Sequence, residues 1–94
     1  MRIKWLDLAL DDLEDIAGYI SEDNPDAARR AVSRLWKAVR MLAKQPEIGR
    51  PGRVHGTREL VVADTPFIVP YRLVGSEIQI LRVLHGARDW PKSF

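Results

Sequence analysis

The chain has 94 residues, no cysteine and a formal net charge of +2, from 15 lysines and arginines against 13 aspartates and glutamates. A chain of this length forms one domain, residues 1–94, and without cysteine it has neither a disulfide framework nor a thiolate zinc site, which favours a cytoplasmic location. No apolar run reaches the ~18 residues of a membrane span, and the N-terminus leads into acidic sequence instead of the apolar stretch of a signal peptide, so we expect no membrane partner.

The charge changes sign along the chain. Up to Ala28 there are two basic and eight acidic residues, whereas from Arg29 onward there are thirteen basic and five acidic residues, a net charge of +8. This division predicts an acidic flank and a basic body, and the basic body is expected to attract a polyanion or an acidic protein segment. The alternative for any one cluster is an ordinary solvated helix surface.

A short strand and a helix are predicted at the start of the chain. The strand is expected at residues 2–6. From Asp7 to Ser21, acidic residues occupy the first half, where the helix dipole favours them. Over the same stretch, apolar side chains recur with the helical period at Leu13, Ile16, Ala17 and Ile20, which predicts an amphipathic helix.

A second helix is predicted after Asn24 and Pro25, an N-cap residue followed by a proline in the first helical turn. It is expected to run to about Gln45 because Pro46 ends it, and to form an antiparallel hairpin with the first helix. Its predicted buried stripe is Ala28, Ala31, Val32, Leu35, Val39 and Leu42. Its outer side carries a basic ladder, which consists of Arg30, Arg34, Lys37, Arg40 and Lys44.

Residues 46–56, PEIGRPGRVHG, are rich in glycine, proline and arginine and are expected to form a loop. Beyond them, three strands are predicted at residues 57–62, 67–74 and 77–85, with Gly75 and Ser76 as the two-residue turn between the last two. The element order therefore predicts an α+β fold, in which an N-terminal strand joins a small antiparallel β-sheet and the helical hairpin packs on one face of that sheet.

The two-residue turn sets which side chains share a face of the sheet. Because Pro70 has no N–H to donate, its strand must leave that position unpaired or contain a bulge, and both alternatives stay open. The face expected to meet the helices carries Phe67, Val69, Tyr71, Leu73, Ile78, Ile80 and Leu84, with Arg82 as the one misfit. The outer face is expected to carry Glu59, Val61, Ile68, Pro70, Arg72, Glu77, Gln79, Leu81, Val83 and His85.

The helical hairpin followed by RELVV, YRLV and RVLHGAR, in that order and spacing, resembles the RelE/ParE superfamily, the toxins of bacterial type II toxin-antitoxin modules. The resemblance covers essentially the whole chain. It implies a small cytoplasmic toxin that is neutralised by a cognate antitoxin, and a toxin-antitoxin complex that binds operator DNA through the antitoxin. An acidic or amphipathic antitoxin would suit the basic ladder.

The resemblance leaves two activities open. RelE-like toxins cut messenger RNA on the ribosome, using cations on the open face of the sheet, whereas ParE-like toxins inhibit DNA gyrase. Cleavage of RNA without a metal requires a base, an acid and cations that stabilise the phosphorane. The strand lysine positions of the RelE branch align with Glu59 and Val61, and a strand arginine position aligns with Ile68. None of the three is a cation, which favours gyrase inhibition.

The RelE-like alternative has four catalytic candidates, which are expected near one edge of the sheet: Arg58, Arg72, His85 and Arg88. His85 suits a general acid or base because imidazole exchanges protons near neutral pH, or it caps the end of its strand through a backbone hydrogen bond. Trp90 and Pro91 are expected to pin the C-terminal segment across the sheet or the helices. Residues expected to bind protein partners are Arg30, Arg34, Lys37, Arg40, Lys44, Arg50, Arg53, Arg72, Arg88 and Trp90.

The sequence is therefore compatible with three functions. The favoured function is a gyrase inhibitor with an antitoxin partner. The alternatives are an endoribonuclease whose partners are the ribosome and messenger RNA, and a degenerate member that no longer poisons the cell but still binds its antitoxin. With two histidines and no cysteine, no metal site and no cofactor are expected.

Overall fold

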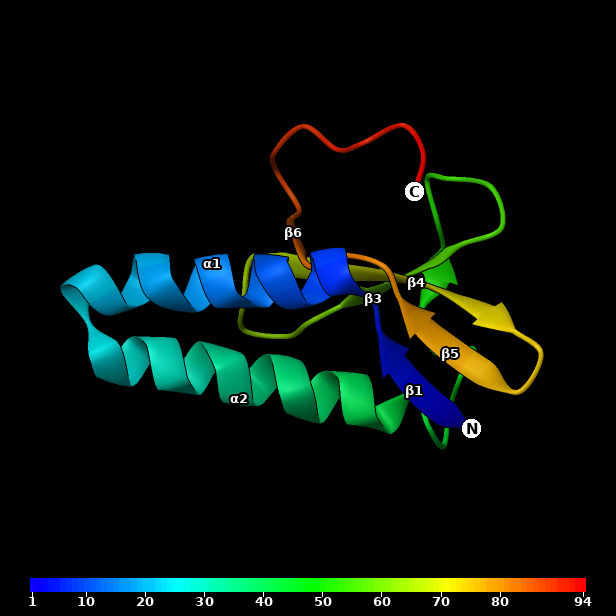
Figure 1. Cartoon of the computed structure of the whole chain (residues 1–94), viewed down its shortest axis with the longest axis horizontal. Helices are drawn as coiled ribbons and strands as arrows, with labels where there is room; N and C mark the ends of the chain where they lie inside the picture. Colours follow the sequence, from blue (N-terminus) through cyan, green and yellow to red (C-terminus); the bar gives the residue numbers. More distant parts are fainter.

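Two helices pack against a six-stranded sheet in the computed structural model, which describes residues 1–94 (Figure 1). The strand order is β1-β5-β4-β3-β2, and β6 pairs with β4 outside this path. All strand pairs are antiparallel except β1 with β5, and the α+β class is as predicted. In chain order the elements are β1 (Arg2–Trp5), α1 (Asp7–Asp23), α2 (Pro25–Met41), β2 (Arg50–Pro51), β3 (Arg58–Val61), β4 (Phe67–Val74), β5 (Glu77–Ile80) and β6 (Leu84–His85).

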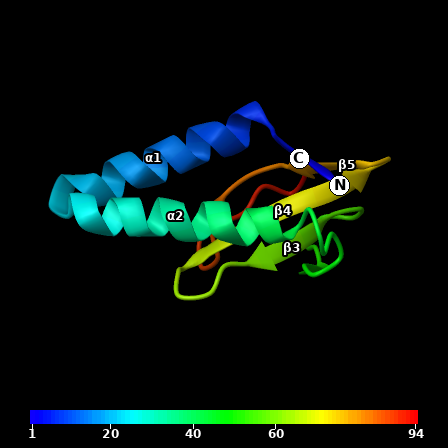
Figure 2. The same cartoon turned by 90° about the horizontal axis from the view of Figure 1, so that it is seen from below.

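The helical hairpin turns at Asn24, as the sequence predicts. The Asn24 side chain accepts a hydrogen bond from the Ala27 N–H at 3.1 Å. Pro25 is in the first turn of α2, where backbone N–H groups have no acceptor within the helix, so the absence of an N–H in proline costs no hydrogen bond. The two helices then run side by side in opposite directions (Figure 2). Neither helix is long and apolar enough to cross a membrane.

The second helix is shorter than predicted. Its end was expected near Gln45 because of Pro46, but α2 ends at Met41. The residues that follow form tighter turns, in which the Ala43 N–H donates to the Arg40 carbonyl at 3.2 Å and the Lys44 N–H to the Met41 carbonyl at 3.1 Å; the Gln45 N–H then donates to the Met41 carbonyl at 2.9 Å. The chain thus leaves the helix before the proline and stays hydrogen-bonded up to it.

The main core lies between the helical hairpin and the sheet. Fully enclosed side chains include Leu35 of α2, Tyr71 of β4 and Ile78 of β5. Burial of a large apolar side chain contributes about 1.5–3 kcal/mol, so a few such residues account for much of the stability of a small domain. The core cluster consists of Ala9, Leu13, Leu35, Val39, Leu42, Leu60, Val62, Val69, Tyr71, Ile78, Ile80 and Val83.

The last predicted strand, residues 77–85, is divided into β5 and β6. Its first part pairs as expected: Gly75 closes the turn with a φ of 61°, which glycine adopts without strain, and Val74 lies opposite Glu77. The pairing continues to Tyr71 opposite Ile80 and then stops. A single continuous strand was therefore the wrong prediction for this segment.

The interruption falls at Pro70. The Leu81 N–H donates to the Pro70 carbonyl at 3.0 Å, but Pro70 has no N–H with which to return the bond. Pairing resumes with Ile68 opposite Leu84, where an uninterrupted register would place Val83. One extra residue is thus accommodated opposite β4, which is a bulge, and this answers the question that Pro70 raised.

The extra residue reverses the faces of β6. Val83 packs in the core although the outer face was predicted for it, and Leu84 lies opposite Ile68 although the core was predicted. His85 likewise moves from the expected outer face to the helix side, opposite Phe67. Since successive side chains of a strand alternate between faces, a shift of one residue explains all three errors.

Tyr71 fastens the residues that follow α2 to the sheet. Its hydroxyl donates to the Pro46 carbonyl at 2.8 Å and accepts from the Gly49 N–H at 2.9 Å. Gly49 is needed at this contact, because a Cβ there would lie 2.6 Å from the Tyr71 ring. Burial raises the pKa of Tyr71 above its ordinary value of 10.0, against smaller opposing effects from the Gly49 hydrogen bond and Arg58.

We expect the free energy of unfolding to fall as the pH rises above 10.0, because the unfolded chain then releases the phenol proton while folded Tyr71 keeps it. Tyr71→Phe removes this contribution and should lose less stability over the same range. Near neutral pH the variant should be about 1–2 kcal/mol less stable than the wild type, since the Gly49 N–H loses its acceptor. Urea unfolding across the pH range measures both effects, and identical pH slopes for the two proteins would contradict the assignment.

Candidate functional site

A buried carboxylate stands on the outer face of the sheet. Glu59 of β3 is 2% exposed and lies opposite Pro70 of β4 and Arg50 of β2. Its Oε1 accepts from Arg50 Nε at 3.1 Å and Nη2 at 3.0 Å, and its Oε2 accepts from the Arg53 backbone N–H at 2.7 Å. These bonds accompany the pairing that forms β2 at Arg50–Pro51, within a stretch that was predicted to be entirely loop.

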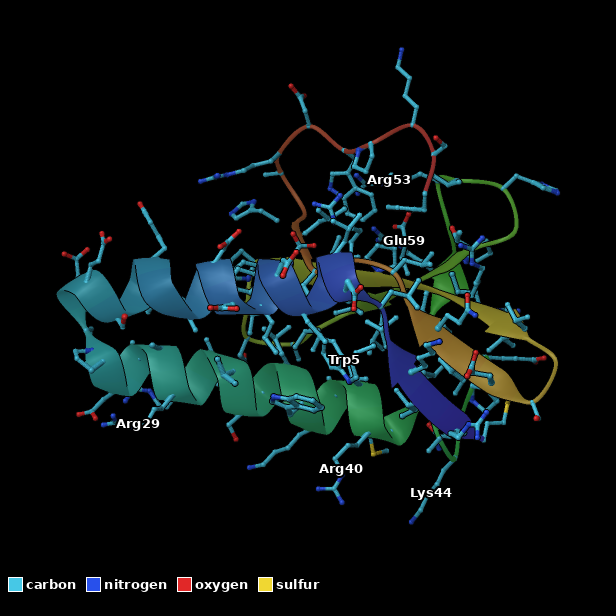
Figure 3. The ribbon with its side chains drawn as sticks, viewed as in Figure 1. Trp5, Arg29, Arg40, Lys44, Arg53 and Glu59 are labelled. Atoms are coloured by element: carbon cyan, nitrogen blue, oxygen red, sulfur yellow. The ribbon has the colours of Figure 1, made fainter.

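Arg53 connects this cluster to the C-terminal segment (Figure 3). Its guanidinium carbon lies 3.8 Å from the centre of the Trp90 ring, and its Nε lies 3.7 Å from Glu59. The Trp90 Nε1 also donates to the His85 carbonyl at 3.1 Å. The segment after β6 is thus turned back toward the loop that carries Arg53 (Figure 1), and Trp90 contacts Arg53 of that loop and the His85 carbonyl. We name Glu59, Arg50, Arg53 and Trp90 the Glu59 cluster.

The four catalytic candidates of the RelE-like alternative are divided between two hollows. Arg58 and Arg72 line a small one of about 280 Å³ beside the loop that precedes β3. His85 and Arg88 line a larger one of about 800 Å³ between the helices and the strand ends. The single cluster expected from the sequence therefore does not form.

The Arg58 side chain is held by two backbone carbonyls of the residues that follow α2. Its Nη1 donates to the Gly49 carbonyl at 2.9 Å and to the Glu47 carbonyl at 3.3 Å. Arg72 lies opposite Gln79 of β5, but the Gln79 amide donates to Glu77, at 3.1 Å. Arg72 forms no ion pair, and its buried Nε–H has no acceptor.

The large hollow is a groove with walls of opposite charge. Asp12 and Asp15 of α1 line one side, and Arg30 and Arg34 of α2 line another. Apolar side chains from both helices and from the strand ends line the rest, including Ile16, Ile20, Phe67 and Val83. This arrangement suits an amphipathic protein segment, since it offers apolar contact together with charges of both signs.

His85 is one of the residues that line this groove. Its Nδ1 accepts from the Ala87 N–H at 3.1 Å, and its ring meets Phe67 edge to face with 6.2 Å between ring centres. The backbone hydrogen bond expected of a structural histidine is therefore present. Nδ1 is the acceptor in this geometry, so the proton of a neutral ring lies on Nε2.

Four members of the basic ladder, Arg30, Arg34, Lys37 and Arg40, are exposed on α2 as predicted, whereas Lys44 is exposed in the turns that follow the helix. None of its five members forms a salt bridge; the one ion pair on α2 joins Arg29 to Asp26. Arg30 and Arg34 line the groove, whereas Arg40 and Lys44 extend away from the body of the molecule (Figure 3). The ladder thus presents unpaired positive charge from the groove to the far end of α2.

Arg82, the misfit of the sequence analysis, bonds to a residue of α1. Asp12 accepts from Arg82 Nε at 2.7 Å, from Arg82 Nη2 at 3.0 Å and from the Val83 N–H at 3.0 Å. The hydrogen bond from Asp12 raises the pKa of Arg82 above its ordinary value, so the guanidinium stays charged. This bridge joins α1 to the bulge and thereby holds the β6 side of the groove.

No group of three or more histidine, cysteine, aspartate or glutamate side chains is placed to hold a metal ion.

Residues 3–90 match a family model described as ParE toxin of type II toxin-antitoxin system, parDE. The protein Y4kP of Sinorhizobium fredii, named as a candidate toxin, is 50% identical over 91 residues, which are 97% of this chain and 94% of that protein. Toxin RelE2 of Caulobacter vibrioides is 38% identical over 87 residues, which are 93% of this chain and 97% of that one. A solved structure of the chromosomal ParDE TA system from P. aeruginosa aligns with a TM-score of 0.79 and 37% identity, over 88% of this chain and 92% of that chain.

Proposed function

This chain belongs to the ParE toxin family of type II toxin-antitoxin systems, and we propose that it acts by inhibiting DNA gyrase. The main support for this proposal is the geometry of the Glu59 cluster. A nuclease needs free cations on the outer sheet face to stabilise a phosphorane, but this position holds a buried carboxylate to which Arg50 and Arg53 are bound. That arrangement favours a protein that acts by docking rather than by cutting RNA.

Purified gyrase tests the proposal directly. We expect the protein to reduce supercoiling of relaxed plasmid and to stabilise the complex in which gyrase holds cleaved DNA. Adding the cognate antitoxin first should restore supercoiling, which controls for non-specific inhibition by a basic protein. Unchanged supercoiling and unchanged cleavage complex at micromolar protein would reject gyrase as the target.

The second candidate function is ribosome-dependent cleavage of messenger RNA. It is favoured by the groove, which is lined by Arg30, Arg34 and Arg88 together with His85, and by the relative named Toxin RelE2. Primer extension on transcripts after induction tests it, because ribosome-dependent cuts fall in phase with codons. A host that keeps dividing after induction would instead indicate the third candidate, a degenerate member that only binds its antitoxin.

The groove and the basic ladder are where we propose that the cognate antitoxin binds. An amphipathic helix with acidic residues toward Arg30 and Arg34 would bury the apolar floor and neutralise the ladder. Arg50, Arg53, Arg72, Arg88 and Trp90 belong to the same proposal as contacts for extended parts of the antitoxin or for the target. Operator DNA is proposed to be bound by the antitoxin within the complex.

A further inference from the structure

β1 is the outermost strand at one edge of the sheet (Figure 1), and it pairs only with β5, in parallel. The Arg2 N–H and the Leu6 N–H both donate toward β5, at 3.4 Å and 3.0 Å. Alternate residues of a strand direct their backbone groups to opposite sides, so Lys4 also faces β5, whereas Ile3 and Trp5 face away from it. The N–H and C=O groups of Ile3 and Trp5 therefore form a free edge that another strand could pair with.

Cations flank this free edge on both faces of the sheet. On the outer face, the Arg2 side chain is 83% exposed and Lys4 is exposed. On the helix side, the residues after α2 adjoin the start of β1, since the N-terminal ammonium donates to the Ala43 carbonyl at 2.8 Å, and Lys44 extends from there away from the molecule (Figure 3). Lys4 and Lys44 form no salt bridge, and Arg2 lies 3.6 Å from Glu77. The edge is thus positively charged.

Apolar surface accompanies the edge on the helix side. Ile3 and Trp5 are half-buried against the core. The Trp5 ring meets the ring of Trp36 of α2 with 4.6 Å between ring centres, and Trp36 is 39% exposed. An apolar side chain placed beside Ile3 and Trp5 would therefore contact indole surface that is now open to water.

We infer that β1 pairs with an extended segment of a protein partner in which acidic residues alternate with apolar ones. Backbone hydrogen bonds to Ile3 and Trp5 hold the segment, its acidic side chains lie beside Arg2 and Lys4, and its apolar side chains lie toward Trp36. A second copy of this chain fits less well, because antiparallel pairing of two β1 strands sets Lys4 opposite Lys4 or Arg2 of the other copy.

A peptide in which glutamate and valine alternate over about eight residues, with acetyl and amide ends, is the probe on the intact chain. Amide hydrogen exchange followed by NMR is the measurement. We expect the Ile3 and Trp5 amides to exchange about tenfold more slowly when about nine-tenths of the protein has bound the peptide, because only the free protein then exchanges rapidly. The Lys4 amide faces β5 and is the internal control, so its exchange should not change.

N-methylated peptides separate strand pairing from simple attraction between charges. If the segment is antiparallel to β1, its valine N–H groups face Ile3 and Trp5, and methylating them should abolish the slow exchange. If it is parallel, its glutamate N–H groups do so, and methylating those should abolish it. Slow exchange that survives both modifications would overturn the inference.

Lys4→Glu tests the charge preference and should weaken binding of the unmodified peptide by about five- to tenfold. Lys92→Glu is the matched control, since it makes the same change of charge at an exposed lysine of the C-terminal segment, and it should leave the affinity unchanged. Equal affinities in the two variants would contradict the inference. Slow exchange of Ile3 and Trp5 that develops without peptide as the protein concentration rises would also contradict it, in favour of a second copy. None of these outcomes depends on whether gyrase is the target.

Discussion

Glu59→Ala should lower the free energy of unfolding by about 2–4 kcal/mol, the largest loss expected here from a single polar substitution. The carboxylate is 2% exposed and accepts two bonds from Arg50 and one from the Arg53 N–H. Removing it leaves that N–H without its acceptor and opens a cavity on the outer sheet face. The loss stays below that of a fully buried ion pair because the Arg50 side chain is 50% exposed and regains water. Urea unfolding followed by circular dichroism measures it.

The same substitution should loosen the C-terminal segment, because Glu59 holds the Arg53 that covers Trp90. Trypsin should then cut after Arg88 faster than in the wild type, at a protein concentration and temperature where both remain folded. Glu14→Ala is the matched control, since Glu14 is exposed on α1 and forms no salt bridge; it should change stability by less than about 0.5 kcal/mol. A Glu59→Ala protein as stable as that control would show that the Glu59 cluster contributes nothing.

Asp12→Ala should cost about 2–3 kcal/mol. Asp12 accepts three hydrogen bonds from the bulge, two from Arg82 and one from the Val83 N–H, and the Arg82 side chain is only 26% exposed. Its removal leaves a charge and a backbone donor without their acceptor at the junction of α1 and the sheet. The same urea unfolding experiment measures the loss.

A double-mutant cycle separates this bridge from ordinary packing. Arg82→Met alone should also destabilise the protein, because it leaves the Asp12 carboxylate without its charged partner. Asp12→Ala with Arg82→Met should cost less than the two single changes together, by about 1–3 kcal/mol. Losses that simply add would mean that the two side chains act independently, contrary to the bidentate geometry.

The parts of the fold that were predicted correctly depend on short stretches of chain. The Asn24 cap and the Gly75 turn each need only neighbouring residues, so both helices and the central hairpin were placed from local patterns. Pro70 likewise signalled that the ladder is interrupted. What it could not signal was where the extra residue is accommodated.

The parts that were missed depend on partners distant in sequence. The bulge places Arg82 where it meets Asp12, 70 positions away, and no local pattern contains that pair. The face of His85 follows from this bulge, so an error of register placed His85 on the same face as Arg72 in the prediction. β2 was missed for a similar reason, because its two residues pair with β3 across the loop.

The candidate site was only partly predictable. The basic ladder could be drawn from helical periodicity, and its five residues are exposed as expected. Alternation along β3 placed Glu59 on the outer face, but not its burial beneath Arg50 and Arg53. The Arg72 Nε–H has no acceptor, and Glu77 contacts Gln79 and Arg2; sequence spacing specifies neither.

We propose that this protein acts by docking on gyrase and that its sheet does not cut RNA. The most direct test measures two quantities in the same culture after induction. The first is the amount of DNA breaks with gyrase bound to them, and the second is the position of the 5′ ends of messenger RNA. We predict gyrase-linked breaks that disappear in a host with toxin-resistant gyrase, and no codon-phased transcript ends. Codon-phased ends in a culture whose DNA stays intact would contradict the account.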